Sequence, residues 1–233
     1  MKAFRVLLYK ELQATFTSPV GYTIIAVFLL VMGYTFSLTL VATRVANLNY
    51  IFHQIYVLSI LLVPAITMRA FAEERASDTL ELLLSSPVHE AAIVFAKFLA
   101  MLALVLAMIA GSTVYALILW LYGDPDWGPI YSGYLALTLL AAFLISIGLL
   151  MSSLTENQVV AAALTLGTAL MLWYADSVAG ILPTPFDSFA LNMSLIGHFH
   201  PMATGSVFLS DIGYFITLTM LVLFLAIRKL QAR

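Results

Sequence analysis

The chain has 233 residues, of which 63% are hydrophobic and 9% are charged, and its mean hydropathy is +1.04. Soluble domains are about one quarter charged and about half apolar, so this composition excludes a soluble globular protein and predicts an integral membrane protein. The formal charge of −2, without any basic run, argues against nucleic-acid binding, and the lack of cysteine excludes disulfides and thiolate metal sites.

The first segment, residues 1–18, predicts an amphipathic helix at the membrane surface. Apolar residues recur every four positions from Phe4 to Phe16, and basic and polar residues fall largely on the other side. Pro19 predicts a break before the first span. The alternative, in which these residues act only as a charged orientation signal, stays open.

Six apolar segments are long enough to cross a bilayer, because a helix rises about 1.5 Å per residue and needs about 20 residues for the hydrocarbon core. They cover residues 20–43, 50–68, 93–121, 131–154, 159–182 and 211–227. The first is too long for the core of a signal peptide, so we expect it to be retained. No polar segment is long enough for a soluble module, which predicts one all-α membrane domain over residues 1–233.

Lysine and arginine residues predict the orientation, because positive charge near span ends tends to stay in the cytoplasm. With the N-terminus inside, nine of the ten basic residues are cytoplasmic and only Arg44 is outside. The sequence therefore predicts a multi-pass protein with both termini in the cytoplasm.

Residues 69–92 form the cytoplasmic segment between the second and third spans, and they are rich in charge. Asp78 followed by Glu81 resembles a helix N-cap with an acid three positions later, which predicts a short helix over residues 79–84. A serine–proline pair at residues 86–87 then starts the helix that continues into the third span.

The short predicted helix carries leucine at positions 80 and 82–84, rimmed by charged residues. An apolar cluster with a charged rim is typical of a surface that docks into a groove on another protein. The same leucines could instead pack on the cytoplasmic helix ends of this chain. The residues alone leave both interpretations open.

Catalytic and nucleotide-binding motifs are missing from the chain. The run HEAAI at residues 89–93 lacks the second histidine of a zinc motif, no lysine follows the glycines of a P-loop, and no serine-nucleophile motif occurs. Few ionisable residues fall inside the spans, which disfavours a self-powered proton-coupled transporter. If ATP drives this protein, another chain must bind it.

The external segment over residues 182–210 is too polar and broken to span, and too apolar for a solvated loop. We expect short helices that dip into the outer leaflet, where protein shelters the backbone. His198 and His200 could form a metal site with Asp187 or Asp211, but a spacing of two without a third fixed ligand favours interfacial histidines with water-exposed rings.

Three stretches resemble the six-span permease subunits of type-2 ABC transporters, especially the branch associated with gliding motility. They are KELQATFTSPVGYTIIAVFLL at the first span, EERASDTLELLLSSPVHEAAIVFAKFLA after the second, and LNMSLIGHFHPMATGSVFLSDIGYF before the last. The resemblance extends over essentially the whole chain, and the central stretch is the most specific.

The resemblance implies the type-2 ABC exporter fold. Its parts are an amphipathic connecting helix (1–18), six spans, a cytoplasmic coupling helix within 69–92 and short re-entrant helices within 182–210. It also implies a separate ATPase subunit that carries ATP and Mg²⁺, no cofactor on this chain, and a dimer with a second copy or a paralogue. The implied ATPase contacts are Glu73, Glu74, Arg75, Asp78, Thr79, Glu81, Leu82, Leu83, Ser86 and Pro87.

Two functions fit these implications. The first is a permease that exports an unidentified substrate across the cytoplasmic membrane of a prokaryote. The second is a mechanotransmission subunit that relays ATP-driven motion to an extracytoplasmic partner, with no solute crossing. The short external loops favour the first.

Overall fold

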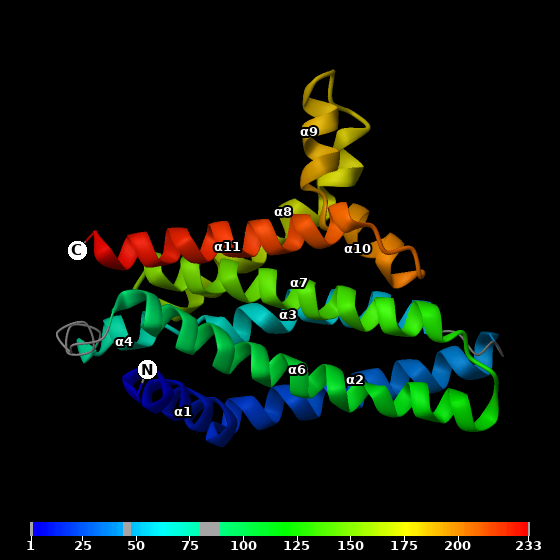
Figure 1. Cartoon of the computed structure of the whole chain (residues 1–233), viewed down its shortest axis with the longest axis horizontal. Coiled ribbons are helices and arrows are strands. Elements are labelled where there is room, and N and C mark those ends of the chain that lie inside the picture. Colours follow the sequence, from blue (N-terminus) through cyan, green and yellow to red (C-terminus); the bar gives the residue numbers. More distant parts are fainter. Residues whose placement is uncertain (1, 44–47, 80–88, 233) are drawn as a thin grey trace.

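The computed structural model describes residues 2–43, 48–79 and 89–232, and every regular element in these ranges is a helix. In chain order the helices are α1 (Lys2–Thr17), α2 (Pro19–Thr43), α3 (Asn49–Thr67), α4 (Ala72–Ala76), α6 (Glu90–Tyr122), α7 (Trp127–Leu154), α8 (Gln158–Ala179), α9 (Phe186–Met193), α10 (Leu195–Ala203) and α11 (Leu209–Gln231). The long helices lie side by side, and α1, α4 and the C-terminus share one end of the bundle (Figure 1).

The six predicted spans correspond to α2, α3, α6, α7, α8 and α11, which are long and apolar enough to cross a membrane. Four boundaries differ from the prediction by three or four residues: α6 and α7 begin earlier, α8 ends earlier and α11 ends later. Helix α8 ends at Ala179 because Gly180 and the nearby Pro183 interrupt it. Helix α11 continues beyond residue 227 because Arg228 and Lys229 favour a helix C-terminus and can extend towards water.

Helix α7 is the centre of the bundle and contacts α3, α6, α8, α10 and α11. Small residues let α3 approach it closely. A Cβ on Gly133 would collide with the Phe52 ring, and one on Gly148 would collide with the Thr67 side chain. Close backbone approach at small residues is a usual source of stability between membrane helices, because lipid supplies little hydrophobic driving force.

Helix α1 forms as predicted and lies against α6. Leu7 is buried and Phe4 and Phe16 are partly buried, whereas Tyr9 is exposed. The predicted break lies at Ser18, and α2 starts at Pro19. The apolar face of α1 is therefore covered at least in part by protein.

Helices α9 and α10 occupy the segment where re-entrant helices were expected, and they differ in burial. Leu195, Phe199 and Met202 of α10 are buried in the core against α3, α7 and α8. In contrast, α9 has no buried residue and projects away from the bundle (Figure 1).

Candidate functional site

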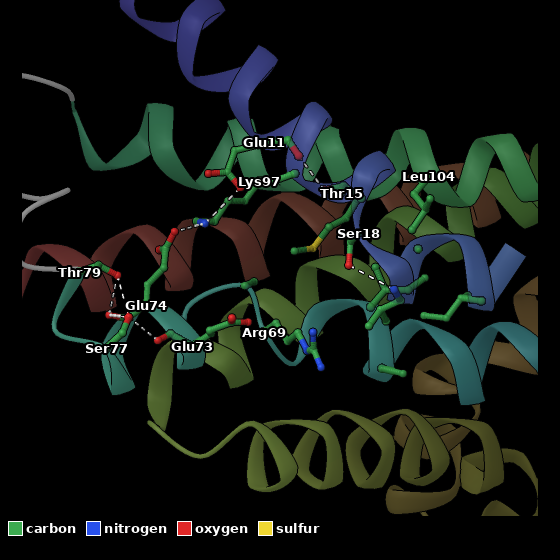
Figure 2. A pocket seen from close by; sticks show the side chains of 18 residues that line it. Glu11, Thr15, Ser18, Arg69, Glu73, Glu74, Ser77, Thr79, Lys97 and Leu104 are labelled. Carbon is green, nitrogen blue, oxygen red and sulfur yellow. Dashed lines mark hydrogen bonds and ion pairs between the residues drawn. The ribbon is translucent and has the colours of Figure 1, made fainter.

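Three helices that are distant in the sequence meet through charged side chains at the end of the bundle that carries both termini. The Lys97 ammonium of α6 lies 2.6 Å from Glu74 Oε1 of α4 and 3.3 Å from Glu11 Oε2 of α1. Figure 2 shows these three side chains joined in a row. We call them the Lys97 cluster.

The Lys97 cluster is largely shielded from water. The exposed fraction of the side chain is 4% for Lys97, 12% for Glu11 and 21% for Glu74. The Lys97 ammonium also lies 5.5 Å from the centroid of the Phe71 ring, within reach of a cation–π contact. Because burying an unpaired charge is costly, removing one member of such a cluster destabilises the protein by about 3–5 kcal/mol.

A single hydroxyl group anchors the start of α4 to the end of α7. The backbone N–H groups of Phe71 and Ala72 both donate to Ser152 Oγ at 3.0 Å, and the Ser152 hydroxyl donates to the Met68 carbonyl at 3.1 Å. These N–H groups have no partner inside α4, because the first amides of a helix are left unpaired. Ser152 therefore fixes the turn between α3 and α4.

A second contact holds α4 to the same place. Arg75 Nη2 donates to the Ser153 carbonyl at 2.6 Å. Through Ser152 and Arg75 the first helix of the predicted coupling region is attached to α7, and through Glu74 it is attached to α6 and α1. Helix α4 is therefore in direct polar contact with α7 and α6, and it is joined to α1 through Lys97.

A cavity of about 410 Å³ lies beside the Lys97 cluster, between the α1–α2 junction, the α3–α4 turn and α6. Its polar lining includes the whole cluster together with Arg69 and Glu73 (Figure 2). Its apolar lining comes from α2, the end of α3 and α6. This volume lies within the range of about 300–1,000 Å³ that is usual for small-molecule sites.

The structure describes half of the predicted ATPase contacts. Glu73, Asp78 and Thr79 are exposed, whereas Glu74 and Arg75 are partly buried and bind partners within the chain. The remaining five lie outside the described residues: Glu81, Leu82, Leu83, Ser86 and Pro87. For all ten residues, contact with an ATPase stays a prediction.

Asp78 differs from the N-cap that the sequence suggested. Its φ of 56° lies in the left-handed region, whereas an N-cap residue is usually extended. Aspartate is one of the few residues besides glycine that tolerate this conformation, and here it turns the chain sharply after α4. Thr79 is helical, and its hydroxyl donates to the Glu74 carbonyl at 3.2 Å. The rest of the predicted helix over residues 79–84 lies outside the described residues.

Sequence reasoning did not identify Glu11, Lys97 or Ser152 as site residues. Two signals were available. Lys97 stands among apolar residues at the start of the third span, where an ionisable side chain suggests a specific role. Glu11 follows Leu7 by four positions, which puts a carboxylate on the buried face of α1. Ser152 gave no comparable signal, because a serine near a span end is common.

The external histidines lie in two environments. His200 is exposed, as expected. The prediction of a water-exposed ring is wrong for His198, which is partly buried. Its side chain is 19% exposed, its Nδ1 lies 2.8 Å from Asp211 Oδ1, and its ring stacks on Tyr214 at 4.0 Å between centroids. Among the described residues no three histidine, cysteine or acidic side chains gather into a metal-binding group.

Comparison with known proteins identifies one family. No curated protein matches the chain. The family model described as "ABC-2 family transporter protein" matches residues 5–227, which is nearly the whole chain. The match covers α1, the Lys97 cluster and all six spans, and we conclude that the chain belongs to the ABC-2 family of membrane permeases of ABC transporters.

Proposed function

We propose that the chain couples ATP hydrolysis on a separate ATPase subunit to the export of a substrate across the cytoplasmic membrane of a prokaryote. The carrying observation is the attachment of α4 to α7 through Ser152 and to α6 and α1 through Lys97. Residues 69–92, which include α4, are the proposed coupling region, and the ten predicted contact residues, among them Leu82 and Leu83, are the proposed contact with the ATPase. Force applied there reaches the spans through short polar contacts.

The mechanism needs two arrangements of the bundle that differ in their contacts with the ATPase, because a partner shifts a conformational equilibrium only by its differential affinity. When two ATPase subunits close on ATP, they move the coupling region and α4 with it. Ser152 and Arg75 transfer this displacement to α7, and Lys97 transfers it to α6 and α1. The spans then rock and open a path between two permease subunits.

We propose a dimer with a second copy or a paralogue, and the uneven burial of the spans supports it. Buried residues make up 22% of the apolar stretch of α2, 17% of that of α8 and 28% of that of α11, against 61–67% for α3, α6 and α7. We expect α2 and α8 to contact the partner, with α9 extending towards it. The path between protomers needs no charged relay.

The predicted orientation fits this proposal. Arg69 and Lys97 line the cavity at the end of the bundle that carries both termini, and Arg75 belongs to α4 at the same end (Figure 1). The positive-inside rule favours a cytoplasmic position for this end. ATP is available there. We also propose that the chain falls within the gliding-motility branch of the family, which rests on the three stretches quoted above.

Co-purification with the ATPase tests the proposal. We expect Leu82→Asp together with Leu83→Asp to abolish co-purification with the cognate ATPase while the permease still inserts. Leu154→Asp with Val159→Asp is the matched control, because both residues are exposed apolar side chains at the same membrane end. Unchanged co-purification of the Leu82 and Leu83 variant would contradict the docking assignment.

Vesicles that contain the permease and ATPase distinguish the two functions. ATP-dependent movement of a solute or lipid supports export. ATP turnover without such movement, together with an extracytoplasmic protein that co-purifies, supports mechanotransmission.

A further inference from the structure

The cavity beside the Lys97 cluster has a polar part and an apolar part. The polar part carries Glu11, Glu73 and Glu74 with Arg69 and Lys97. The apolar part is formed by Val20 and Ile24 of α2, Ala65 and Ile66 of α3, and Met101 and Leu104 of α6. Because these apolar residues belong to membrane spans and most of them are buried, the cavity extends from the water-facing end of the bundle into its membrane-spanning part.

Two exposed charges and one carboxylate oxygen of the polar part have no partner among the described residues. Glu74 Oε1 binds Lys97, but Glu74 Oε2 is buried without a hydrogen-bond partner. Arg69 and Glu73 form no ion pair within the described ranges, although both line the cavity. A buried, unpaired carboxylate oxygen is costly, and a donor from a ligand would relieve that cost.

The balance of charge defines the ligand. Three carboxylates face two cations, so the cavity has one surplus negative charge. An ammonium group suits the side of the cavity where Glu73 and Glu74 lie and can donate to Glu74 Oε2, whereas the Arg69 guanidinium suits a phosphate. A ligand with both groups is a zwitterion, and the apolar part of the cavity suits an attached acyl chain.

We propose that this cavity binds a phospholipid with a primary ammonium headgroup, of the phosphatidylethanolamine class. The ammonium lies between Glu73 and Glu74, the phosphate lies at Arg69, and an acyl chain runs along Ile24, Ile66 and Leu104. A trimethylammonium headgroup has no N–H for Glu74 Oε2. An anionic headgroup without an ammonium is repelled by the surplus carboxylate. Under the proposed orientation the lipid comes from the cytoplasmic leaflet.

This lipid is a constituent of the permease and is distinct from the exported substrate. The cavity is lined by helices of one chain and is open to the outside, whereas the proposed transport path lies between two chains. Its walls include α1, α4 and α6, which the Lys97 cluster joins. A lipid bound there fills the space between the helices that receive the motion of the coupling region.

Native mass spectrometry of the full-length chain tests the proposal. The chain is purified in detergent, freed of lipid, and titrated with phosphatidylethanolamine, phosphatidylcholine or phosphatidylglycerol of the same acyl chains. We expect one phosphatidylethanolamine per chain to bind about tenfold more tightly than either other lipid, the ratio given by one charge-assisted hydrogen bond. Equal binding of the three lipids would overturn the proposal.

Variants locate the binding to the cavity. We expect Glu73→Gln and Arg69→Gln each to remove most of the preference for phosphatidylethanolamine, and Ala65→Trp to prevent binding by filling the apolar part. Glu156→Gln and Arg228→Gln are matched controls, because they remove one exposed charge of the same kind away from the cavity. A preference that survives all three cavity variants would place the lipid elsewhere and overturn the assignment.

One further outcome is decisive. Soluble phosphoethanolamine that competes as well as the lipid at equal concentration would show a soluble ligand and contradict the lipid. The preference of the unmodified chain needs no variant, so a variant that fails to fold leaves the test intact. Binding is measured without ATP or ATPase, so its failure is separate from failure of the proposed function.

Discussion

Lys97 lies 2.6 Å from Glu74, which precedes it by 23 positions and lies in the first helix of the predicted coupling region. The ion pair therefore closes the loop between the second and third spans from within the chain. Glu11 approaches the same ammonium from α1. The Lys97 ammonium thus joins α1 to α4 and α6. Helices α4 and α6 flank the loop that we propose docks on the ATPase.

Replacing Lys97 with methionine tests the energetic role of the cluster. We expect the free energy of unfolding in detergent to fall by about 3 kcal/mol, the low end for a buried ion pair, because Glu74 keeps some contact with water. The loss comes mainly from two carboxylates left without a cation. The triple variant Lys97→Met, Glu11→Gln, Glu74→Gln should therefore recover part of the stability, and a triple variant less stable than Lys97→Met alone would refute this account.

Ser152→Ala tests the anchor of α4. The variant leaves the N–H groups of Phe71 and Ala72 without their acceptor, and we expect a loss of about 2 kcal/mol in the free energy of unfolding. Ser153→Ala is the matched control, because that hydroxyl is equally buried but donates only to the Leu150 carbonyl of its own helix. Similar losses of unfolding free energy in both variants would show that Ser152 has no special role as an anchor.

The same pair of variants tests the transmission of motion. If Ser152 carries the displacement of α4 to α7, Ser152→Ala should leave ATP turnover of the reconstituted complex in place while transport falls. Ser153→Ala should change neither. Equal retention of transport in both variants would show that the displacement takes another route.

Gly148→Ala tests the close contact between α3 and α7. A Cβ at this position collides with the Thr67 side chain, and we expect the overpacking to cost about 1–3 kcal/mol in the free energy of unfolding. Gly167→Ala on α8 is the control, because nothing lies within 4 Å of the added Cβ. We expect it to be neutral or slightly stabilising, since alanine favours a helix over glycine.

Asp211→Asn tests the pair that joins α10 to α11. His198 Nδ1 loses a charged acceptor at 2.8 Å, and we expect a loss of about 1–2 kcal/mol in the free energy of unfolding. His200→Gln, at an exposed position, is the control. Zn²⁺ that raises the unfolding temperature of the unmodified chain and not of Asp211→Asn would instead indicate a metal site.

The spans could be predicted because a bilayer imposes a minimum apolar length that is visible in the sequence. The Lys97 cluster could not, since its partners lie 23 and 86 positions away and no periodicity connects them. Glu74 and Arg75 were predicted as contacts with the ATPase because the family resemblance puts them in the coupling region. Their partners depend on how α4 lies against α6 and α7, which is a property of the three-dimensional structure alone.

The distance along the chain between Glu11 and Lys97 has a consequence for biosynthesis. At about 5–20 residues per second, the 86 positions between them take roughly 4–17 s to synthesise. During that interval α1 has already left the ribosome, but the buried carboxylate of Glu11 has no cation to meet. We therefore expect α1 to lie on the membrane surface at first, and to pack against α6 only after that third span is inserted.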